Sequence, residues 1–453
     1  MSELRPLLRL AGPVILAEIG WMSMGLVDTA MVGPLGPAAI AATGMGNGVF
    51  TAIMIFGAGL MLGVDALVSR AMGAGRLDDG VRWLHQAVIL ALIVAPIIMA
   101  VTWIAFLTIG AWGLNPQIAV LAKPYLAVIA LGAPPLMLYS AFRRYLQGIH
   151  VVRPMIYALI TANLVNAGAN AVLIYGLYGM PALGVVGSAW STCIARVYLA
   201  GFYYVVIRRE HRRRGAAHPY VPFAIDAHRL RHLFAFGAPA AGQITVEVSV
   251  FVLATALAAR LDAVSSASHQ IALNIVSTGF MVPLGLASAG AVRVGHAVGA
   301  RDMRRARHAG WTALLLGGTI MVMLGAVLFA FPVLMLRPFT TDASVLALGS
   351  RLLAIAAAFQ LFDGTQAVTT GVLRGIGDTR TPVLMNIIGH WVLGLPVGYA
   401  LCFRFGWGVL GLWIGLSVGL IFCAVALTFT WIARTRGLDL PPDVHTPEPA
   451  ELL

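Results

Sequence analysis

Long apolar segments dominate the chain, and short polar connections separate them. Twelve such segments recur, and each holds the roughly 20 apolar residues that a helix needs to cross a membrane. We expect helices over residues 8–33, 44–68, 84–112, 121–146, 155–177, 183–207, 233–258, 268–292, 309–331, 344–371, 383–403 and 407–432. The pattern therefore predicts an all-α integral membrane protein with twelve transmembrane helices.

The composition agrees with this pattern. Hydrophobic residues make up 59% of the 453 residues and charged residues 11%, whereas about a quarter of a soluble protein is charged. The first span begins so soon after Met1 that we expect no short cleavable signal peptide. The three cysteines lie in apolar segments without metal-ligand spacing, so we expect neither disulfides nor a zinc site.

Basic residues are concentrated on one side of the predicted bundle, because successive connections alternate between basic and nearly uncharged. The termini and the connections after spans 2, 4, 6, 8 and 10 hold 24 of the 30 Lys and Arg residues. By the positive-inside rule both termini are cytoplasmic, as expected of a multi-pass protein of the inner membrane. Contact with anionic membrane lipids then accounts for the net charge of +12, so no nucleic-acid partner is expected.

The two halves of the chain repeat each other. At an offset of 226 residues, Pro13 matches Pro239, and the pairs Gly59-Leu60 and Gly73-Ala74 match Gly285-Leu286 and Gly299-Ala300. Six spans per half is an even number, so both halves insert in the same orientation. We expect two pseudo-symmetric six-helix lobes around a central cleft. The predicted divisions are an N-lobe over 1–207, a cytoplasmic linker over 208–231, a C-lobe over 232–436 and a cytoplasmic tail over 437–453.

Internal repeats in a twelve-span bundle indicate alternating access rather than a fixed pore. The sequence has no Gly-rich phosphate-binding loop and no soluble domain to hold one. We therefore predict a transporter that is not an enzyme, has no cofactor and is driven by an ion gradient.

Three acidic residues lie deep in the predicted membrane. At about 1.5 Å per residue, Glu247 is ~24 Å beyond Arg231, Asp363 ~16 Å from Arg374, and Asp28 ~28 Å beyond Arg9. An ionisable side chain at such depth is costly and is functional by default. We therefore assign these three carboxylates to ion or proton coupling.

Other polar residues in the spans allow two interpretations each. Asn166 and Asn170, spaced i and i+4, are compatible with a site beside Asp28 or with simple interhelical hydrogen bonds. Glu18, in the inner half of the first span, either faces a lumen or pairs with an arginine. Arg196 is its partner or a counter-ion elsewhere. Asp342 is interpreted first as the N-cap of the helix expected over 344–371.

Near the inner surface, Asp65 is expected to pair with Arg70.

A coupling mechanism follows from the acidic residues deep in the predicted membrane. Two carboxylates in a poorly solvated site titrate as a pair and raise each other's proton affinity. Such a group holds a proton or Na⁺ from one side, or an organic cation from the other, but not both together. Mutual exclusion is sufficient for antiport if the lobes switch access.

Several stretches resemble the multidrug and toxic compound extrusion (MATE) transporters, in particular their NorM-type bacterial members. The resemblance covers about residues 7–433. The stretches that carry it are GLVDTAMVG, LVNAGANAVLIYG, VEVSVFVLATAL, SHQIALNIVSTGFMVPLGLASAGAVRVGHAVGA and FDGTQAVTTGVLRGIGDTRTP. The resemblance implies two six-helix lobes in an outward-facing V and efflux of cationic drugs in exchange for Na⁺ or H⁺.

Carried over by motif, Asp28 with Asn166 and Asn170 forms an N-lobe cation site, and Glu247 with Asp363 forms a C-lobe site. Na⁺ is a candidate ligand at Glu247, Asp363 or Asp28. The resemblance also implies, more weakly, a substrate contact at Asp342.

Glu18 departs from the usual pattern of the family, and it joins the N-lobe candidates as an additional acid. Arg374 in the LRG motif is expected at an inner gate or against lipid. The motifs leave Na⁺ and H⁺ open as the coupling ion. We expect small amphipathic cations as substrates, membrane lipids as the surroundings and a monomer.

Two other transporter classes remain as alternatives. A lipid-linked oligosaccharide flippase of the same superfamily usually has additional C-terminal spans and a cationic cavity, whereas here the deep charges are mostly acidic. A major facilitator transporter also has two six-span halves, and MGAGRLDDGVR loosely resembles its basic loop. The SHQIALN and LRG stretches argue against that class.

Overall fold

The computed structural model describes residues 3–112, 116–214 and 221–436, and these residues form helices without any strand among them. The first half contains α1 (Leu4–Val32), η1 (Gly33–Leu35), α2 (Pro37–Gly73), α3 (Leu77–Thr108), η2 (Ile109–Ala111), α4 (Pro116–Ala130), α5 (Ala133–Gly148), α6 (Arg153–Tyr175), η3 (Leu177–Gly179) and α7 (Val185–Arg214). The predicted tail, 437–453, lies outside the described residues, as does part of the predicted linker, 215–220.

The second half repeats this arrangement. It contains α8 (Ala227–Ala258), α9 (Ala263–Gly299), α10 (Met303–Ala330), α11 (Pro332–Leu336), α12 (Ala343–Ile376), α13 (Arg380–Asn386), η5 (Ile387–Gly394), α14 (Leu395–Tyr399), η6 (Ala400–Arg404) and α15 (Gly408–Arg436). Aspartates begin several of these helices. Asp226, Asp262, Asp302 and Asp342 each accept a hydrogen bond from a backbone N–H of the first turn, which satisfies a donor that the helix itself cannot.

The helices confirm the prediction of twelve spans. Eleven of those described are long and apolar enough to cross a membrane, and the pair α4–α5 supplies a twelfth although it is bent by 50°. The bend follows from the sequence, because Pro134 and Pro135 in the first turn of α5 cannot donate backbone hydrogen bonds to α4. The eleventh span departs from an α-helix, since η5 and η6 are π-helical.

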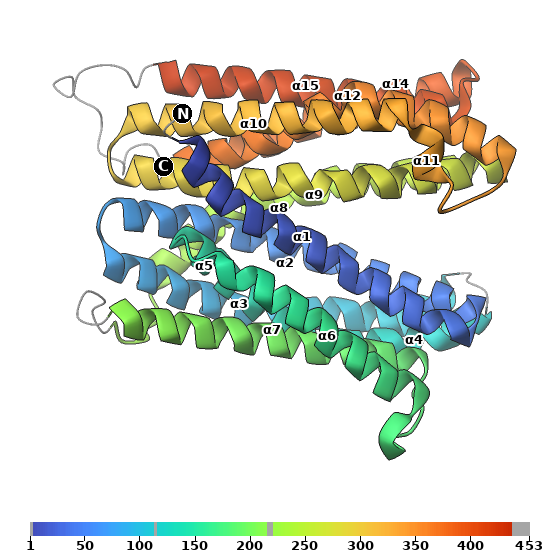
Figure 1. Cartoon of the computed structure of the whole chain (residues 1–453), viewed down its shortest axis with the longest axis horizontal. Coiled ribbons are helices and arrows are strands. Elements are labelled where there is room, and N and C mark those ends of the chain that lie inside the picture. Colours follow the sequence, from blue (N-terminus) through green and yellow to red (C-terminus); the bar gives the residue numbers. More distant parts are fainter. Residues whose placement is uncertain (1–2, 113–115, 215–220, 437–453) are drawn as a thin grey trace.

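The lobes meet mainly along α1, α2, α8 and α9. α2 packs against α8 and α9, and α1 packs against α9. Ile15 of α1 lies against Gly285 of α9, whereas Gly20, farther along α1, lies against Leu159 of α6. Figure 1 shows the result: α1 starts beside α9 and diverges from it towards the far end of the molecule.

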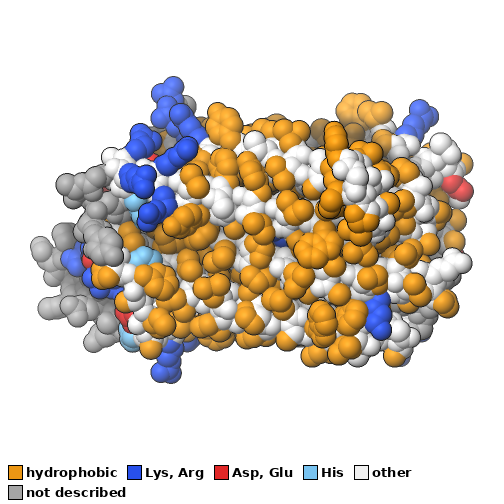
Figure 2. Space-filling model, turned by 90° about the horizontal axis from the view of Figure 1, so that it is seen from below, with side chains coloured by type: hydrophobic (Ala, Val, Ile, Leu, Met, Phe, Trp, Pro, Cys, Tyr) orange, Lys and Arg blue, Asp and Glu red, His pale blue; other side chains and the backbone are white. Residues whose placement is uncertain are grey.

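Both described ends of the chain lie at the same end of the bundle (Figure 1). We call it the basic end, because α1 begins there, α15 finishes there and most Lys and Arg side chains gather there in Figure 2. Between the two ends, the visible face is largely apolar. Within the spans, large side chains such as Leu26, Leu164 and Phe429 are exposed, as expected of a surface that faces lipid.

Candidate functional site

The deep polar residues of the N-lobe form one cluster around Asp28. Its Oδ1 accepts hydrogen bonds from Asn166 Nδ2 at 3.0 Å and from Asn170 Nδ2 at 2.7 Å. Its Oδ2 accepts a third from Thr192 Oγ1 at 2.8 Å. All four side chains are buried. The carboxylate of α1 is therefore held by neutral donors from α6 and α7.

Sequence reasoning missed the contribution of α7. Besides Thr192, Ser191 donates a hydrogen bond to Asn170 Oδ1. A periodic signal was available, since Ser188, Thr192 and Arg196 are four residues apart and lie on one face of a helix. A polar stripe within an apolar span is costly unless the facing helix supplies partners, and here it faces Asp28.

Arg196 lies one turn beyond this cluster. It is buried, and its guanidinium carbon is 4.5 Å from the centroid of the Phe50 ring, in a cation–π contact. Its charge acts on Asp28. The interpretation of Arg196 as a partner of Glu18 is wrong, whereas that of a counter-ion elsewhere agrees with this position.

In the C-lobe, the half-buried Glu247 of α8 has a donor on its own helix. Gln243 Nε2 donates to Glu247 Oε2 at 2.7 Å, across one turn. Gln366 of α12 also interacts with this carboxylate, and its Nε2 donates to Asn386 Oδ1 at 3.0 Å. Glu247 thus belongs to an amide-rich cluster formed by α8, α12 and α13.

Asp363 is buried on α12, and the charge of Glu247 acts on it. Within the described part of the chain, no side chain or backbone group donates a hydrogen bond to the Asp363 carboxylate. Buried atoms of Gln360, Gln366 and His390 also lack hydrogen-bond partners among the described residues. Buried polar atoms are nearly always satisfied by protein, water or a ligand, so this region is suited to a proton, a cation or water.

The two lobes therefore offer different chemistry. The Asp28 carboxylate accepts hydrogen bonds from three neutral donors. The C-lobe holds two carboxylates without a paired arginine among the described residues. In the repeat comparison, Glu247 corresponds to Trp21, which stacks on Tyr139 with ring centroids 5.5 Å apart. The lobes share a fold but not a site.

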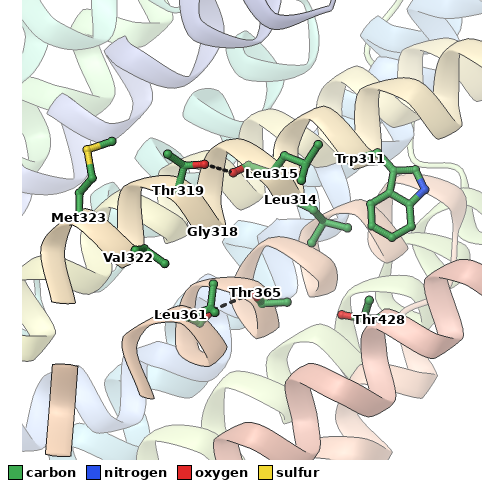
Figure 3. A pocket seen from close by; sticks show the side chains of 10 residues that line it. All are labelled: Trp311, Leu314, Leu315, Gly318, Thr319, Val322, Met323, Leu361, Thr365 and Thr428. Atoms are coloured by element: carbon green, nitrogen blue, oxygen red, sulfur yellow. Dashed lines mark hydrogen bonds between the residues drawn. The ribbon is translucent and has the colours of Figure 1, made fainter. Parts of the chain in front are cut away.

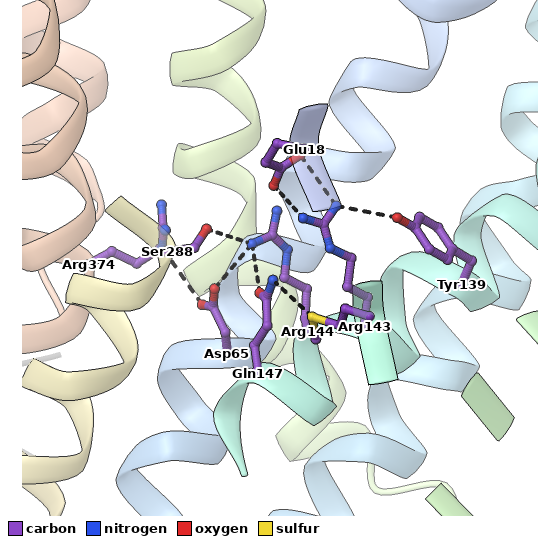
Figure 4. Close-up of polar contacts among 9 residues, drawn as sticks. Glu18, Asp65, Tyr139, Arg143, Arg144, Gln147, Ser288 and Arg374 are labelled. Atoms are coloured by element: carbon purple, nitrogen blue, oxygen red, sulfur yellow. Dashed lines mark hydrogen bonds and ion pairs between the residues drawn. The ribbon is translucent and has the colours of Figure 1, made fainter. Parts of the chain in front are cut away.

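Glu18 belongs to a third cluster, close to the basic end. It forms an ion pair with Arg143 of α5, and Arg143 also donates to the Tyr139 hydroxyl at 3.4 Å. Figure 4 shows this pair beside Arg144 and Asp65. Glu18 is thus paired with an arginine and lies apart from the Asp28 cluster, to which the sequence analysis had joined it as an additional coupling acid.

The expected pair of Asp65 with Arg70 is wrong. Asp65 is fully buried on α2 and lies 3.4 Å from Arg144 Nη1 and 3.8 Å from Arg374 Nε. Arg70 instead donates to the backbone carbonyl of Gly375, at 3.0 and 3.2 Å. A charge on a helix pairs with whatever the neighbouring helix presents, and here α12 of the other lobe presents both Arg374 and a free carbonyl.

These contacts cross the boundary between the lobes. Arg374 is buried rather than in contact with lipid, and Arg144 Nη1 also donates to Ser288 Oγ of α9 at 2.9 Å. At the chain start, Glu3 pairs with Arg293 of α9 and accepts from Arg305 Nε of α10 at 2.9 Å. Polar contacts therefore hold the lobes together at the basic end.

At the opposite end, Asp342 is an exposed N-cap of α12, as expected. Its Oδ1 accepts from the backbone N–H of Ser344 at 2.8 Å and of Val345 at 3.2 Å. Among the described residues, no group of three or more His, Cys, Asp or Glu side chains is suited to a bound metal ion.

The chain matches the MatE family model twice, over residues 13–172 and 239–400, so each lobe contains one copy of the domain. A probable multidrug resistance protein NorM of Mesorhizobium japonicum is 36% identical over 447 residues, which cover 96% of this chain and 95% of that protein. The multidrug resistance protein NorM of Burkholderia vietnamiensis is 35% identical over 448 residues, with 96% and 95% covered.

Solved structures share the fold. The eukaryotic MATE transporter AtDTX14 superposes with a TM-score of 0.86 at 20% identity, over 96% of this chain and 98% of that one. A MOP superfamily transporter from Pyrococcus furiosus gives 0.85 at 21% identity, over 97% of each chain. The fold therefore persists where the sequences differ at most positions.

Proposed function

This chain belongs to the MatE family of membrane transporters, and from that premise we propose that it exports organic cations in exchange for Na⁺ or H⁺. Family membership confirms the predicted resemblance, and it confirms that the chain is a transporter and not an enzyme. The relatives named NorM support a role in multidrug efflux. The ion, the exported molecules and the residues that couple them belong to the proposal.

One observation carries the proposal. The half-buried Glu247 and the buried Asp363 act on each other and have no arginine partner among the described residues, and buried atoms of Gln360, Gln366 and His390 lack hydrogen-bond partners there. An isolated buried carboxylate is unstable as an anion and takes up a proton or a cation. A drug cation that binds there competes with that proton or Na⁺. This competition couples the two fluxes when the lobes alternate.

The lobe boundary supports alternating access. The contacts of Asp65, Arg70 and Glu3 close the basic end, and α1 diverges from α9 beyond Ile15. By the positive-inside rule, the basic end with both termini lies in the cytoplasm and the protein in the inner membrane. The structure then represents an outward-facing state. Export requires the opposite state, in which these contacts are broken.

The other candidates take different parts in this scheme. Asp28, with Asn166 and Asn170, serves the N-lobe as a second cation site, in which two amide side chains contact the carboxylate. Glu18 stabilises the closed basic end through Arg143. Asp342, at the mouth, meets cationic substrates before they enter. The protein acts as a monomer surrounded by membrane lipid.

No observation favours the alternatives. Family membership removes the major facilitator class. A flippase for an anionic lipid pyrophosphate needs buried cations that are available to the ligand. Here Arg143 is paired with Glu18, and Arg144 and Arg374 share Asp65. Arg196 lies on the Phe50 ring, and its charge acts on Asp28.

Efflux of ethidium from proteoliposomes, driven by an imposed pH or Na⁺ gradient, tests the proposal. The variants Glu247→Gln and Asp363→Asn should each abolish gradient-driven efflux. Asp262→Asn is the matched control, because Asp262 is a fully exposed N-cap and Asn caps a helix equally well. If both carboxylate variants retained full gradient-driven efflux, the assignment of coupling to the C-lobe would be wrong.

A further inference from the structure

An apolar groove runs along the outer side of the C-lobe, between α10, α12 and α15. Its volume is about 470 Å³, within the ~300–1,000 Å³ that is usual for ligand pockets. Ten residues line it: Trp311, Leu314, Leu315, Gly318, Thr319, Val322, Met323, Leu361, Thr365 and Thr428. Figure 3 shows them along the facing sides of the three helices.

The groove faces the lipid rather than the interior of the transporter. Leu315 is 69% exposed and Met323 58% exposed, in a span that is apolar enough to cross a membrane. From Trp311 to Met323 the groove extends over twelve residues of α10, or ~18 Å. That length is close to the ~15 Å of hydrocarbon that one leaflet contributes. An acyl chain lying along α10 fits this length.

Three threonines line the groove, and they differ in one respect. The hydroxyls of Thr319 and Thr365 donate to carbonyls of their own helices, Leu315 O at 2.8 Å and Leu361 O at 2.7 Å. The Thr428 hydroxyl is buried and has no hydrogen-bond partner among the described residues. In Figure 3, Thr428 lies opposite Trp311. An unsatisfied buried hydroxyl at one end of an apolar groove indicates a ligand with a polar group at that level.

Positive charge continues the groove towards the basic end. Arg304 and His308 precede Trp311 by seven and three residues, so all three lie on one face of α10. Both Arg304 and His308 are exposed. A ligand whose apolar chain lies beside Leu315 and Met323 therefore has its polar end beside a cationic surface.

We propose that this groove is a binding site for an anionic glycerophospholipid. One acyl chain lies along α10, the ester carbonyl of that chain accepts a hydrogen bond from Thr428, and the headgroup phosphate lies beside Arg304. The site is separate from the C-lobe carboxylates. Leu361 and Thr365 face the groove, whereas Asp363, which is midway between them on α12, projects from the other side of the helix. Lipid binding is thus independent of the proposed transport function.

Native mass spectrometry of the delipidated full-length protein, titrated with phosphatidylglycerol or with phosphatidylcholine of the same acyl chains, tests this proposal. Phosphatidylglycerol should bind more tightly than phosphatidylcholine. Thr428→Val should weaken its binding by about fivefold, the value of one hydrogen bond. Thr319→Val should leave binding unchanged, because the Thr319 hydroxyl is already satisfied within α10. Gly318→Phe should abolish binding by filling the groove.

A second pair of variants separates the headgroup from general surface charge. Arg304→Gln should reduce the preference for phosphatidylglycerol, whereas Arg212→Gln, which removes an equally exposed arginine from α7 at the same end, should not. Equal binding by the wild type, Thr428→Val and Gly318→Phe would overturn the site, since the lipids would then be a non-specific belt. Equal affinity for the two lipids would overturn the anionic headgroup.

Discussion

Gly73 and Gly299 make the same contact in opposite directions across the boundary between the lobes. A Cβ at Gly73 would lie 1.9 Å from the carbonyl oxygen of His296, and a Cβ at Gly299 would lie 2.0 Å from that of Arg70. His296 and Arg70 are themselves related by the offset of 226 residues. The repeat in the sequence is therefore a pseudo-twofold relationship in space, and glycine allows the backbones of α2 and α9 to touch.

An alanine at either glycine should separate the lobes at the basic end. The added Cβ overlaps a backbone oxygen that cannot move away alone, and such overpacking costs ~1–3 kcal/mol. We expect Gly73→Ala and Gly299→Ala to shift the equilibrium towards the open basic end by similar amounts. The labelling rate of Ser69→Cys, at a buried position beside Gly295, reports this opening in a background without other cysteines.

The matched control is Gly44→Ala, also on α2, where a Cβ meets no atom within 4 Å. It should leave the labelling rate unchanged. Fast labelling in the control, or unchanged labelling in both interface variants, would contradict the role of these contacts.

The Asp65–Arg374 pair should stabilise the same closed state. Removing one partner of a buried ion pair costs ~3–5 kcal/mol, but Asp65 keeps Arg144 at 3.4 Å, so we expect the lower part of that range for Arg374→Gln. Thermal unfolding in detergent measures the loss. In a double-mutant cycle, the loss of stability in Asp65→Asn/Arg374→Gln should be smaller than the sum of the losses in Asp65→Asn and Arg374→Gln, and additive losses would argue against the pair.

Thr192 should matter for transport although it has no charge. It is the donor to Asp28 Oδ2 in this structure, and a hydrogen bond to a charged group contributes ~1.5–3 kcal/mol. We expect Thr192→Val to reduce gradient-driven ethidium efflux by about tenfold or more. Thr161→Val is the control. It removes a hydroxyl that only donates to carbonyls of its own helix, so it should leave ethidium efflux unchanged. Equal efflux by the two variants would show that Thr192 does not contribute to the Asp28 site.

Closure at the basic end should weaken in acid through Glu3. Burial alone would raise the pKa of Glu3, but hydrogen bonds from Arg293 and Arg305 outweigh it, and the pKa is lowered from its ordinary value of 4.5. The contribution of Glu3 is therefore complete above pH 4.5 and is lost as the pH falls through the lowered value. Distances between spin labels at Arg82 and Arg301 should increase over that range. In Glu3→Gln this pH dependence should disappear.

Much of the fold and part of the candidate site could be predicted from the sequence, because the relevant signals are local. Twelve apolar segments, the repeat at 226 residues and the i, i+4 spacing of Asn166 and Asn170 need no knowledge of packing. The partners of Asp65 could not be predicted in that way. They depend on how α2 is rotated towards α12, and Arg70, the nearest arginine along the chain, bonds a backbone carbonyl instead.

The partner of Glu18 illustrates the same limit. Arg143 and Arg196 are both arginines within predicted spans or at their ends, and only the three-dimensional packing places Arg143 beside Glu18 and Arg196 beside Phe50. The π-helical turns of η5 and η6 also depend on packing between helices, since both lie against α15.

The central claim is that a drug cation and the coupling ion exclude each other at Glu247 and Asp363. The most direct test adds tetraphenylphosphonium to the purified protein and measures the H⁺ or Na⁺ that is released into a weakly buffered solution. The wild type should release about one cation per bound molecule, and the Glu247→Gln/Asp363→Asn variant should release none. Stoichiometric binding to the wild type without release of either ion would contradict the claim.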